Sequence, residues 1–303
     1  MTQDQIARLK KLKNAIILAH YYTLPEVQNI ADFVGDSLAL SRQAVETSAD
    51  IILFAGVNFM AETAKILSPN KKVLIPDMEA GCSLSDSCNA EELELFLKNY
   101  PNHTVISYIN CSTKVKTLSD IIVTSGNALK VVNSLPKDEK IVFTPDRNLG
   151  AYINKETGRE MVLWNGACHV HDLLTADEVF KMKENYPKAK VLAHPECKAT
   201  VLALADFVGS TAAMLNFAKN DNSSEFIVAT ETGILYEMKK QNPNKQFYLV
   251  SNPETCACND CEYMKLNTLK KLYHALLTES PEIILEEEVI RKALIPIKKM
   301  LKF

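Results

Sequence analysis

The sequence predicts an α/β fold made of three similar units, each a parallel β-sheet with helices on both faces, related by a pseudo-threefold axis around a central site. The first observation behind this prediction is a layout that occurs three times. Each copy has a short apolar run that ends in a polar residue, a hydroxyl residue 17 positions later, and then a cysteine. The pairs at this spacing are His20 and Ser37, Tyr108 and Ser125, and His194 and Thr211. The copies lie roughly 86–88 residues apart, which suits a small α/β unit and is too long for a solenoid repeat.

The second observation is the alternation of short apolar runs with helical periodicity. In the first unit, the apolar runs at 15–19, 51–55 and 73–75 are typical of buried parallel strands. Apolar residues recur at helical spacing in the segments between them, over 25–33, 38–45 and 59–67. This βαβαβ order is the building unit of an open parallel sheet.

The same alternation continues through the next two units. Strands are expected near 105–108, 141–144 and 161–164 in the second unit, and near 191–193, 226–229 and 247–250 in the third. Beyond Cys261 the pattern stops, and two amphipathic helices are expected at 264–277 and 283–301, the second interrupted at Pro296. The expected boundaries are 1–85, 86–172 and 173–264 for the three units, with 265–303 as helices that pack on the α/β core.

The composition is that of an ordinary globular protein, and it excludes several classes. The chain has 303 residues, of which 47% are hydrophobic and 23% charged, so it can form more than one core. A net charge of −3 and a pI near 6.1 argue against a nucleic-acid partner, which would require a basic face. No apolar run reaches the roughly 18 residues of a membrane span, and residues 1–14 lack a signal-peptide core. We therefore expect a cytoplasmic protein with no membrane partner.

A polar triplet follows the first expected strand of each unit. The three triplets are His20-Tyr21-Tyr22, Tyr108-Ile109-Asn110 and His194-Pro195-Glu196. Open α/β sheets bind ligands at the carboxyl ends of their strands, so these side chains are candidates for contacting a substrate. A lone triplet could simply end its strand, but three matched triplets favour a shared binding site.

A hydroxyl residue stands where a helix is expected to begin in each unit: Ser37, Ser125 and Ser210-Thr211. An aspartate precedes each of the spaced hydroxyl residues by five positions: Asp32, Asp120 and Asp206. A hydroxyl at a helix start usually caps the helix, and the free N–H groups there can also bind anions. Three such ends around one axis would suit a ligand with several carboxylates or a phosphate. The chain has only nine glycines and neither a Walker loop nor a G-x-G-x-x-G motif, so no nucleotide cofactor is expected.

Eight cysteines in a chain of this kind indicate metal or redox chemistry rather than disulfides. Cys82, Cys168 and one of Cys256, Cys258 and Cys261 end equivalent copies of the layout. Thiolates are the usual ligands of iron–sulfur clusters, and a cluster held by three of them keeps one iron open as a Lewis acid. Spacing alone favours Cys256, which lies 45 residues after its hydroxyl, against 45 and 43 in the first two units.

Other interpretations of the cysteines remain open at this point. The close set at 256–261 could bind zinc or form a C-x-x-C redox pair. Cys88 suits a buried free thiol. Cys111 and Cys197 directly follow two of the polar triplets and could approach the site without binding metal.

Six short segments, spread along nearly the whole chain, carry motifs that occur together in one family. They are HYY with PEVQ at 20–28, ADFVGDSL at 31–38, GCSL at 81–84, WNGACHVH at 164–171, HPEC at 194–197 and CEYMKLN at 261–267. Together they resemble the quinolinate synthase family, the A protein of de novo NAD biosynthesis. The resemblance implies three α/β domains around an oxygen-sensitive [4Fe–4S] cluster. It also implies a transferase that condenses iminoaspartate with dihydroxyacetone phosphate to quinolinate, phosphate and water.

The resemblance also implies particular residues. The cluster ligands become Cys82, Cys168 and Cys261, because the family's third ligand directly precedes the Tyr-Met segment. The expected substrate-binding residues are His20, Ser37, Tyr108, Ile109, Asn110, Ser125, His194, Glu196 and Thr211. The candidates for proton transfer are Tyr22, His20, His194 and Glu196, because phenol, imidazole and carboxylate can each act when desolvated and paired. Some family members carry C-x-x-C-x-x-C near the third ligand, where this chain has Thr255 in place of the first cysteine.

Partners and alternatives complete the expectations. Small-molecule substrates are expected, and an L-aspartate oxidase or dehydrogenase could transiently hand over the unstable iminoaspartate. One alternative is another iron–sulfur hydro-lyase that acts on a small di- or tricarboxylate. The other is a non-catalytic metal-binding or redox-sensing protein built on the cysteines at 256–261.

Overall fold

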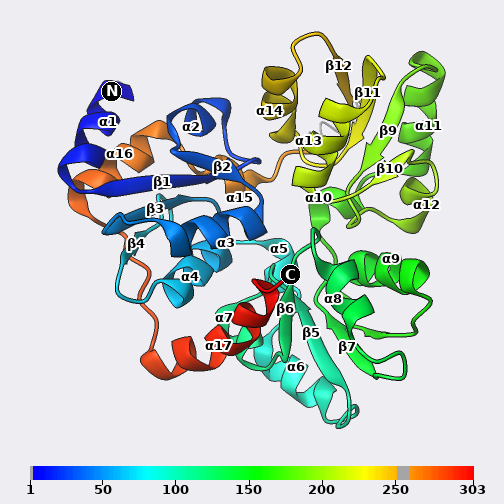
Figure 1. The fold of residues 1–303 in the computed structure, drawn as a ribbon, viewed down its shortest axis with the longest axis horizontal. Helices are drawn as coiled ribbons and strands as arrows, with labels where there is room; N and C mark the ends of the chain where they lie inside the picture. Colours follow the sequence, from blue (N-terminus) through cyan, green and yellow to red (C-terminus); the bar gives the residue numbers. More distant parts are fainter. Residues whose placement is uncertain (1–2, 251–258) are drawn as a thin grey trace.

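The computed structural model describes residues 3–250 and 259–303 and contains three four-stranded sheets, which form three lobes around a common centre (Figure 1). All neighbouring strands within each sheet are parallel. The three strand orders are equivalent: β2-β1-β3-β4, β6-β5-β7-β8 and β10-β9-β11-β12. The predicted α/β class with three similar units is therefore confirmed.

The first sheet and its helices come from the N-terminal part of the chain. Its strands are β1 (Ala15–His20), β2 (Phe33–Gly35), β3 (Ile51–Ala55) and β4 (Lys72–Leu74). The helices around it are α1 (Gln3–Leu12), α2 (Pro25–Ile30), α3 (Ser37–Glu46) and α4 (Asn58–Leu67). Strand β3 is buried along its whole length, as its apolar sequence predicts.

The second and third sheets repeat this arrangement. The second unit contains α5 (Ser83–Asp86), α6 (Ala90–Leu97), β5 (Thr104–Tyr108), α7 (Thr113–Thr117), β6 (Ile121–Val123), α8 (Ala128–Ser134), β7 (Ile141–Thr144), α9 (Arg147–Thr157) and β8 (Val162–Leu163). After it come α10 (His169–Asp172), α11 (Ala176–Asn185), β9 (Lys190–Ala193), α12 (Ala199–Leu202), β10 (Phe207–Val208), α13 (Thr211–Asn220), β11 (Glu225–Ala229), α14 (Ile234–Gln241) and β12 (Gln246–Leu249). The residue boundaries between the units stay a prediction.

Each unit has one more strand than the sequence predicted. The additional strands β2, β6 and β10 lie at the edge of their sheets and have only two or three residues, too few to show a periodic pattern. The expected helix at 25–33 ends at Ile30, and the chain re-enters the sheet at Phe33.

An aspartate secures each of these edge strands. The carboxylate accepts a hydrogen bond from a backbone N–H of the first strand, and the aspartate's own N–H donates to the carbonyl of the same residue. The pairs are Asp32 with Ile17, Asp120 with Val105, and Asp206 with Val191, at carboxylate distances of 2.7, 2.8 and 2.7 Å. The three matched aspartates are thus structural, because each one fixes a second strand beside the first.

The C-terminal helices pack on two different units. Helix α16 (Leu269–Thr278) buries Leu272 and Leu276 with residues of the first sheet, whereas α17 (Glu287–Met300) packs against α7 and β6 of the second unit (Figure 1). The chain therefore returns to both earlier units after the third one.

The predicted bounds of these helices need three corrections. The helix expected at 264–277 is split into α15 (Glu262–Lys265) and α16, because the Asn267 side chain donates to the carbonyls of Gly56 and Met264, and Thr268 caps a new start. The helix expected from 283 begins at Glu287, because Ile283 N–H donates to the carbonyl of Val73 beside β4. Pro296 does not interrupt α17: it is buried inside the helix, where packing compensates for the missing N–H donor.

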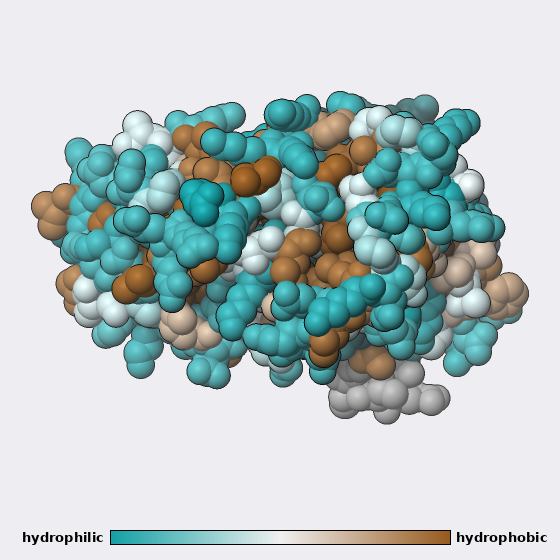
Figure 2. Space-filling view, turned by 90° about the horizontal axis from the view of Figure 1, so that it is seen from below, coloured by the Kyte–Doolittle hydropathy of each residue, from teal (hydrophilic) through white to brown (hydrophobic). Residues whose placement is uncertain are grey.

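Hydrophilic side chains cover most of the face seen from below, with apolar side chains gathered near its middle (Figure 2). Across residues 3–250 and 259–303, no helix has the length and apolar character needed to cross a bilayer.

Candidate active site

A cavity of about 70 Å³ lies where the three units meet. Residues of all three polar triplets line it: His20, Tyr22, Tyr108, Asn110, His194 and Glu196. The three spaced hydroxyl residues and three cysteines line it as well: Ser37, Ser125, Thr211, Cys82, Cys168 and Cys261. Ile109 is the one predicted site residue that does not line it, because its side chain is buried in the hydrophobic core.

The triplets reach the cavity because each one ends the first strand of its sheet. In the first unit, His20 Nδ1 accepts a hydrogen bond from Tyr22 N at 3.2 Å. In the third unit, His194 Nδ1 lies 3.4 Å from Glu196 N in the same way. In these two units, the bend brings the residue at position +2 to the cavity, where Tyr22 and Glu196 both lie.

Two of the three hydroxyl residues stand at helix starts, as predicted, but neither one caps its helix. Asp36 caps α3 by accepting from Ala39 N at 3.0 Å, and Ser210 caps α13 by accepting from Ala213 N at 3.3 Å. The Ser37 hydroxyl therefore remains available at the cavity, whereas Thr211 Oγ1 lies 3.0 Å from the Tyr22 hydroxyl. Both helices are ten residues long, so their N-termini can favour an anionic group.

The prediction that Ser125 starts a helix is wrong. Helix α8 begins at Ala128 with Asn127 before it. Ser125 lies in a turn closed by hydrogen bonds in both directions: Thr124 N donates to Asn127 Oδ1 at 2.7 Å, and Asn127 N donates to the carbonyl of Thr124 at 3.1 Å. The turn brings Ser125 Oγ to 3.2 Å from His194 Nε2, across the boundary between two units.

The three cysteines at the cavity occupy equivalent backbone positions. Cys82, Cys168 and Cys261 each directly precede a helix of four residues, namely α5, α10 and α15. Cys256, which spacing favoured, and Cys258 lie outside the described residues. Cys88, Cys111 and Cys197 are buried and do not line the cavity.

Burial raises the pKa of all three cavity thiols. It raises the pKa of Cys82 to about 12 and that of Cys261 to about 11, although nearby backbone N–H groups oppose the change. Burial and then the charge of Glu196 raise the pKa of Cys168 well above its usual value. Buried thiols of this kind are deprotonated when a cation binds them, so the three residues fit a metal cofactor.

Glu196 stands at the centre of the polar side chains. Its Oε2 lies 3.3 Å from His171 Nδ1 and 3.1 Å from His194 Nδ1, while Oε1 is buried without a partner. Burial raises the pKa of the Glu196 carboxyl, but His171 and His194 outweigh it, so the pKa falls below its usual value. Burial lowers the pKa of His171 to about 3, against the pull of Glu196, so the ring is neutral.

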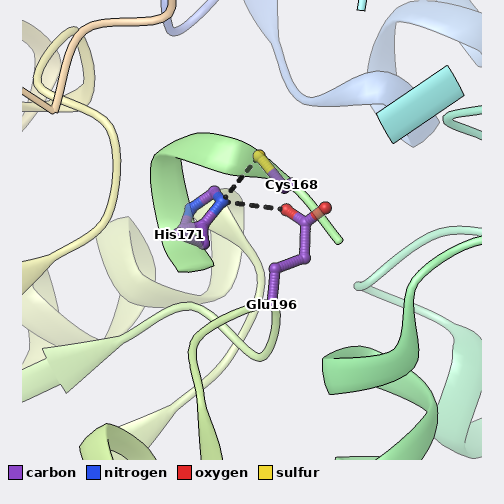
Figure 3. Close-up of side chains that lie close together, drawn as sticks. All are labelled: Cys168, His171 and Glu196. Carbon is purple, nitrogen blue, oxygen red and sulfur yellow. Dashed lines mark hydrogen bonds and ion pairs between the residues drawn. The ribbon is translucent and has the colours of Figure 1, made fainter. Parts of the chain in front are cut away.

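The sequence prediction did not include His171, which touches both a cysteine and the carboxylate (Figure 3). Cys168, His171 and Glu196 are the one set of three possible metal ligands in the described part of the chain whose ligand atoms all lie within 4.8 Å of one another. The sequence signal that could have identified His171 is its position three residues after Cys168, on the short helix α10 that Cys168 precedes.

Tyr22, Tyr108 and His20 have pKa values shifted by burial. Burial raises the pKa of both phenols well above the usual value, and it lowers the pKa of His20 to about 3, with His194 acting in the same direction. The Tyr22 hydroxyl lies 3.0 Å from Thr211 Oγ1 and 2.9 Å from Thr230 Oγ1. The side chains of His20 and Tyr22 are hydrogen-bonded, as buried polar groups require.

Two buried carboxylates hold the loops that carry Cys168 and Cys261. The sequence analysis did not identify either of them. Asp146 Oδ2 accepts from Cys168 N at 3.2 Å, and Glu231 Oε1 accepts from Cys261 N at 3.1 Å. Each acid lies two residues beyond the end of the second central strand of its sheet, β7 or β11. Burial raises the pKa of Glu231 to about 7, with Lys265 opposing it at 2.7 Å.

Comparisons with known proteins agree with this geometry. A family model described as quinolinate synthetase A protein (NadA) matches residues 4–302. A quinolinate synthase of Synechocystis sp. is 55% identical over 296 residues, covering 98% of this chain and 93% of the relative. The quinolinate synthase of Gloeothece citriformis is 53% identical over 297 residues, 98% of this chain and 92% of the relative. That of Chloroherpeton thalassium is 53% identical over 300 residues, 99% of this chain and 93% of the relative. The chain belongs to the quinolinate synthetase A protein family.

Proposed function

We propose that this chain is an enzyme that condenses iminoaspartate with dihydroxyacetone phosphate to form quinolinate, phosphate and water in the central cavity. The observation that carries the proposal is the meeting of three cysteines and three polar triplets, one of each per unit, around one cavity in a member of this family. The relatives named quinolinate synthase weigh against a different hydro-lyase and against a non-catalytic metal protein. The expected cytoplasmic location and a transient aspartate-oxidising partner stay predictions.

We further propose that Cys82, Cys168 and Cys261 hold a [4Fe–4S] cluster. A single zinc ion bonded to thiolates at about 2.3 Å would bring their sulfur atoms to about 3.8 Å from one another. In the described part of the chain, the three cysteines do not form a set of donors within 4.8 Å, although they line the same cavity. A larger cluster suits this wider spacing. When bound, the cluster supplies an iron without a protein ligand, which acts as a Lewis acid.

The polar residues divide into two groups in this proposal. Ser125, Asn110, Tyr108 and Thr211, with the N-terminus of α13, bind the carboxylates of iminoaspartate. His20 and Ser37, with the N-terminus of α3, bind the dihydroxyacetone phosphate portion or the condensed intermediates. Asn110 Oδ1 is buried without a partner, which supports a ligand donor at this position.

Proton transfer falls to Glu196, Tyr22, His194 and His20, all of which line the cavity. Glu196 is the strongest candidate for general acid–base work, because Oε1 has no hydrogen-bond partner while two imidazoles orient Oε2. Desolvation strengthens each of these interactions relative to water.

The first experiment measures iron, sulfide and zinc in protein purified without oxygen, together with its visible spectrum. We expect about four iron and four sulfide per chain, and quinolinate formed from the two substrates, detected by mass spectrometry. Zinc without sulfide would contradict the cluster. An iron–sulfur protein that forms no quinolinate would contradict the reaction.

The role of Glu196 is tested by Glu196→Gln, which keeps the shape and removes the exchangeable carboxylate proton. We expect the cluster's visible absorption to persist and kcat to fall by about 10²–10⁴-fold. Glu184→Gln on the exposed face of α11 is the matched control and should leave kcat unchanged. Full activity of Glu196→Gln would remove Glu196 from acid–base chemistry.

A further inference from the structure

Asn127 lies two residues after Ser125 but does not itself line the cavity. Its side chain is only 3% exposed and lies between two parts of the chain that are far apart in the sequence. Thr124 N donates to Asn127 Oδ1 at 2.7 Å, and Asn127 Nδ2 donates to the carbonyl of Met300 at 3.1 Å. One buried amide therefore joins the turn that carries Ser125 to the last residue of α17. None of the motifs in the sequence includes Asn127, and the proposed reaction assigns it no task.

The orientation of this amide is determined by its two backbone partners. A backbone N–H can only donate a hydrogen bond, and a backbone carbonyl can only accept one. The amide oxygen of Asn127 must therefore face Thr124, and the amide nitrogen must face Met300. The reverse orientation would set donor against donor and acceptor against acceptor. Neither contact involves a group that titrates.

The second unit depends on this amide because its hydroxyl residue does not begin a helix. In the first and third units, the hydroxyl residue is the first residue of a ten-residue helix, and the side chain of the preceding residue caps that helix. Ser125 instead lies three positions before α8, and Asn127 makes no side-chain cap on that helix. The Asn127 side chain reaches back to Thr124, so it holds the residue directly before Ser125.

Helix α17 supports the same turn from outside the second sheet. It packs against β6, the edge strand that leads directly into the turn. Ile297 and Met300 of α17 are fully buried, so the C-terminal end of this helix is fixed by packing. Figure 1 shows this end of the helix near the centre of the three lobes. The Met300 carbonyl is thus a fixed point to which Asn127 can hold the turn.

We propose that Asn127 is a positioning residue that holds Ser125 in the place from which it binds a substrate carboxylate, with α17 as its anchor. Ser125 Oγ lies 3.2 Å from His194 Nε2, so a displaced turn would move the hydroxyl relative to the third unit. This inference rests on the proposed function, in which Ser125 binds iminoaspartate whereas His20 and Ser37 bind the dihydroxyacetone phosphate portion. Loss of the Asn127 contacts should therefore affect one substrate and not the other.

Asn127→Ala tests the inference, because it removes both contacts of the amide. With iminoaspartate generated from oxaloacetate and ammonia, we expect its apparent KM to rise about tenfold, the size of one impaired hydrogen bond to a charged group. The apparent KM for dihydroxyacetone phosphate should change less than twofold. Lys130→Met is the matched control: Lys130 also lies on α8 and donates to the carbonyl of Phe303 at 3.4 Å, and it should leave both values unchanged. Equal rises for both substrates in Asn127→Ala would overturn the inference.

A double-mutant cycle with Ser125→Ala separates positioning from general packing. If Asn127 acts through the Ser125 hydroxyl, Asn127→Ala should raise the KM for iminoaspartate less than twofold in the Ser125→Ala background. An equal rise in both backgrounds would contradict positioning, and so would an unchanged KM in Asn127→Ala alone. Asn127→Ser, whose side chain is one atom shorter than the amide, replaces the alanine variant if that variant does not fold.

A second readout does not depend on turnover. In cluster-loaded protein kept without oxygen, hydrogen–deuterium exchange is followed by mass spectrometry in overlapping peptides that cover residues 121–126. We expect faster exchange in Asn127→Ala than in the parent, and the parent rate in Lys130→Met. Asn127→Asp keeps the acceptor for Thr124 N and loses the donor to Met300, so its exchange rate should lie between the two.

Parent-like exchange in Asn127→Ala would overturn the inference, and parent-like exchange in Asn127→Asp would overturn the anchoring by α17. Both outcomes can be read even if the parent makes no quinolinate, a result that would count only against the proposed function.

Discussion

The loop that carries Cys82 is held in place differently from the loops that carry Cys168 and Cys261. In the second and third units, a buried carboxylate accepts the N–H of the cysteine itself. The equivalent position of the first unit, two residues beyond β3, holds Val57, which has no acceptor in its side chain.

In the first unit, hydrogen-bond donors of Asn58 hold the loop through its carbonyl groups. Asn58 N donates to the carbonyl of Ala80 at 2.8 Å, and Asn58 Nδ2 donates to the carbonyl of Met78 at 2.8 Å. The donor and acceptor roles are therefore exchanged between the units. The comparison teaches that the three cysteine positions are equivalent, while the groups that support them are not, so substitutions at matched positions should have unequal effects.

The largest effect is expected at the cysteines themselves, where the units should not differ. Cys82→Ser should abolish cluster binding as completely as Cys168→Ser or Cys261→Ser, because a hydroxyl is a poor substitute for a soft thiolate ligand. Iron and sulfide analysis checks this, with Cys88→Ser, a buried thiol outside the cavity, as control. A Cys82→Ser protein with full iron content and activity would break the equivalence of the three positions.

The next largest effect is expected at Asp146. Asp146→Ala leaves the N–H groups of Cys168 and Leu149 without their acceptor, at about 1–3 kcal/mol for each buried donor. We expect the visible absorption to decay faster in the presence of an iron chelator. Asp146→Asn keeps one acceptor oxygen for two N–H groups, so its decay rate should lie between those of the parent and Asp146→Ala.

The matched control for Asp146 is Val57→Ala in the first unit. It removes packing from a buried position and lowers Tm, but it removes no hydrogen bond to a cysteine loop. Equal acceleration of cluster loss in Asp146→Ala and Val57→Ala would show that general destabilisation, rather than the carboxylate, governs cluster retention.

A smaller effect is expected from Gly166→Ala, two residues before Cys168. An added methyl would meet Ser87 Oγ and, at 2.5 Å, the carbonyl oxygen of Pro145. Because backbone cannot move aside as a flexible side chain can, we expect a loss of about 1–3 kcal/mol in the free energy of unfolding. Chemical denaturation of the parent and variant measures it; an unchanged midpoint would contradict the close approach.

The smallest effect is expected from Gly81→Ala, directly before Cys82. The added methyl would find its nearest neighbour, a ring carbon of Tyr263, at 3.6 Å, an ordinary contact. We expect a change of less than about 0.5 kcal/mol in the same denaturation experiment. A loss as large as that of Gly166→Ala would mean that the two loops are equally constrained.

The sequence predicted the strands and the polar triplets well because both depend on local patterns. A fully apolar run such as β3 has few alternatives to a buried strand, and a polar triplet at its end reaches a shared edge whenever the sheets are parallel. The edge strands β2, β6 and β10 were not predicted, whereas β4 and β8, equally short strands at the opposite edges, were. The existence of β2, β6 and β10 depends on Asp32, Asp120 and Asp206, whose partners lie 15 residues away.

The supporting residues of the site could not be predicted because their partners lie far away in the sequence, in other units for Thr230 and within the same unit for Asp146 and Glu231. Thr230 is an ordinary hydroxyl residue until Tyr22 and His171 lie on either side of it. Asp146 and Glu231 resemble loop acids in the sequence, and only the fold places cysteine N–H groups against them. Ser125 was expected to start a helix. Instead, the Asn127 side chain accepts from Thr124 N and closes a turn around Ser125, and no pattern of apolar residues indicates this turn.

The attachment of α17 to the second unit bears on the order in which the site can be completed. Asn127, whose side chain closes the turn that carries Ser125, also donates to the carbonyl of Met300 at 3.1 Å, across 173 positions of sequence. During synthesis, the Ser125 turn is made long before the residue that anchors it. Contacts of such long range form late, so one wall of the cavity reaches its final form only after the last helix of the chain has docked.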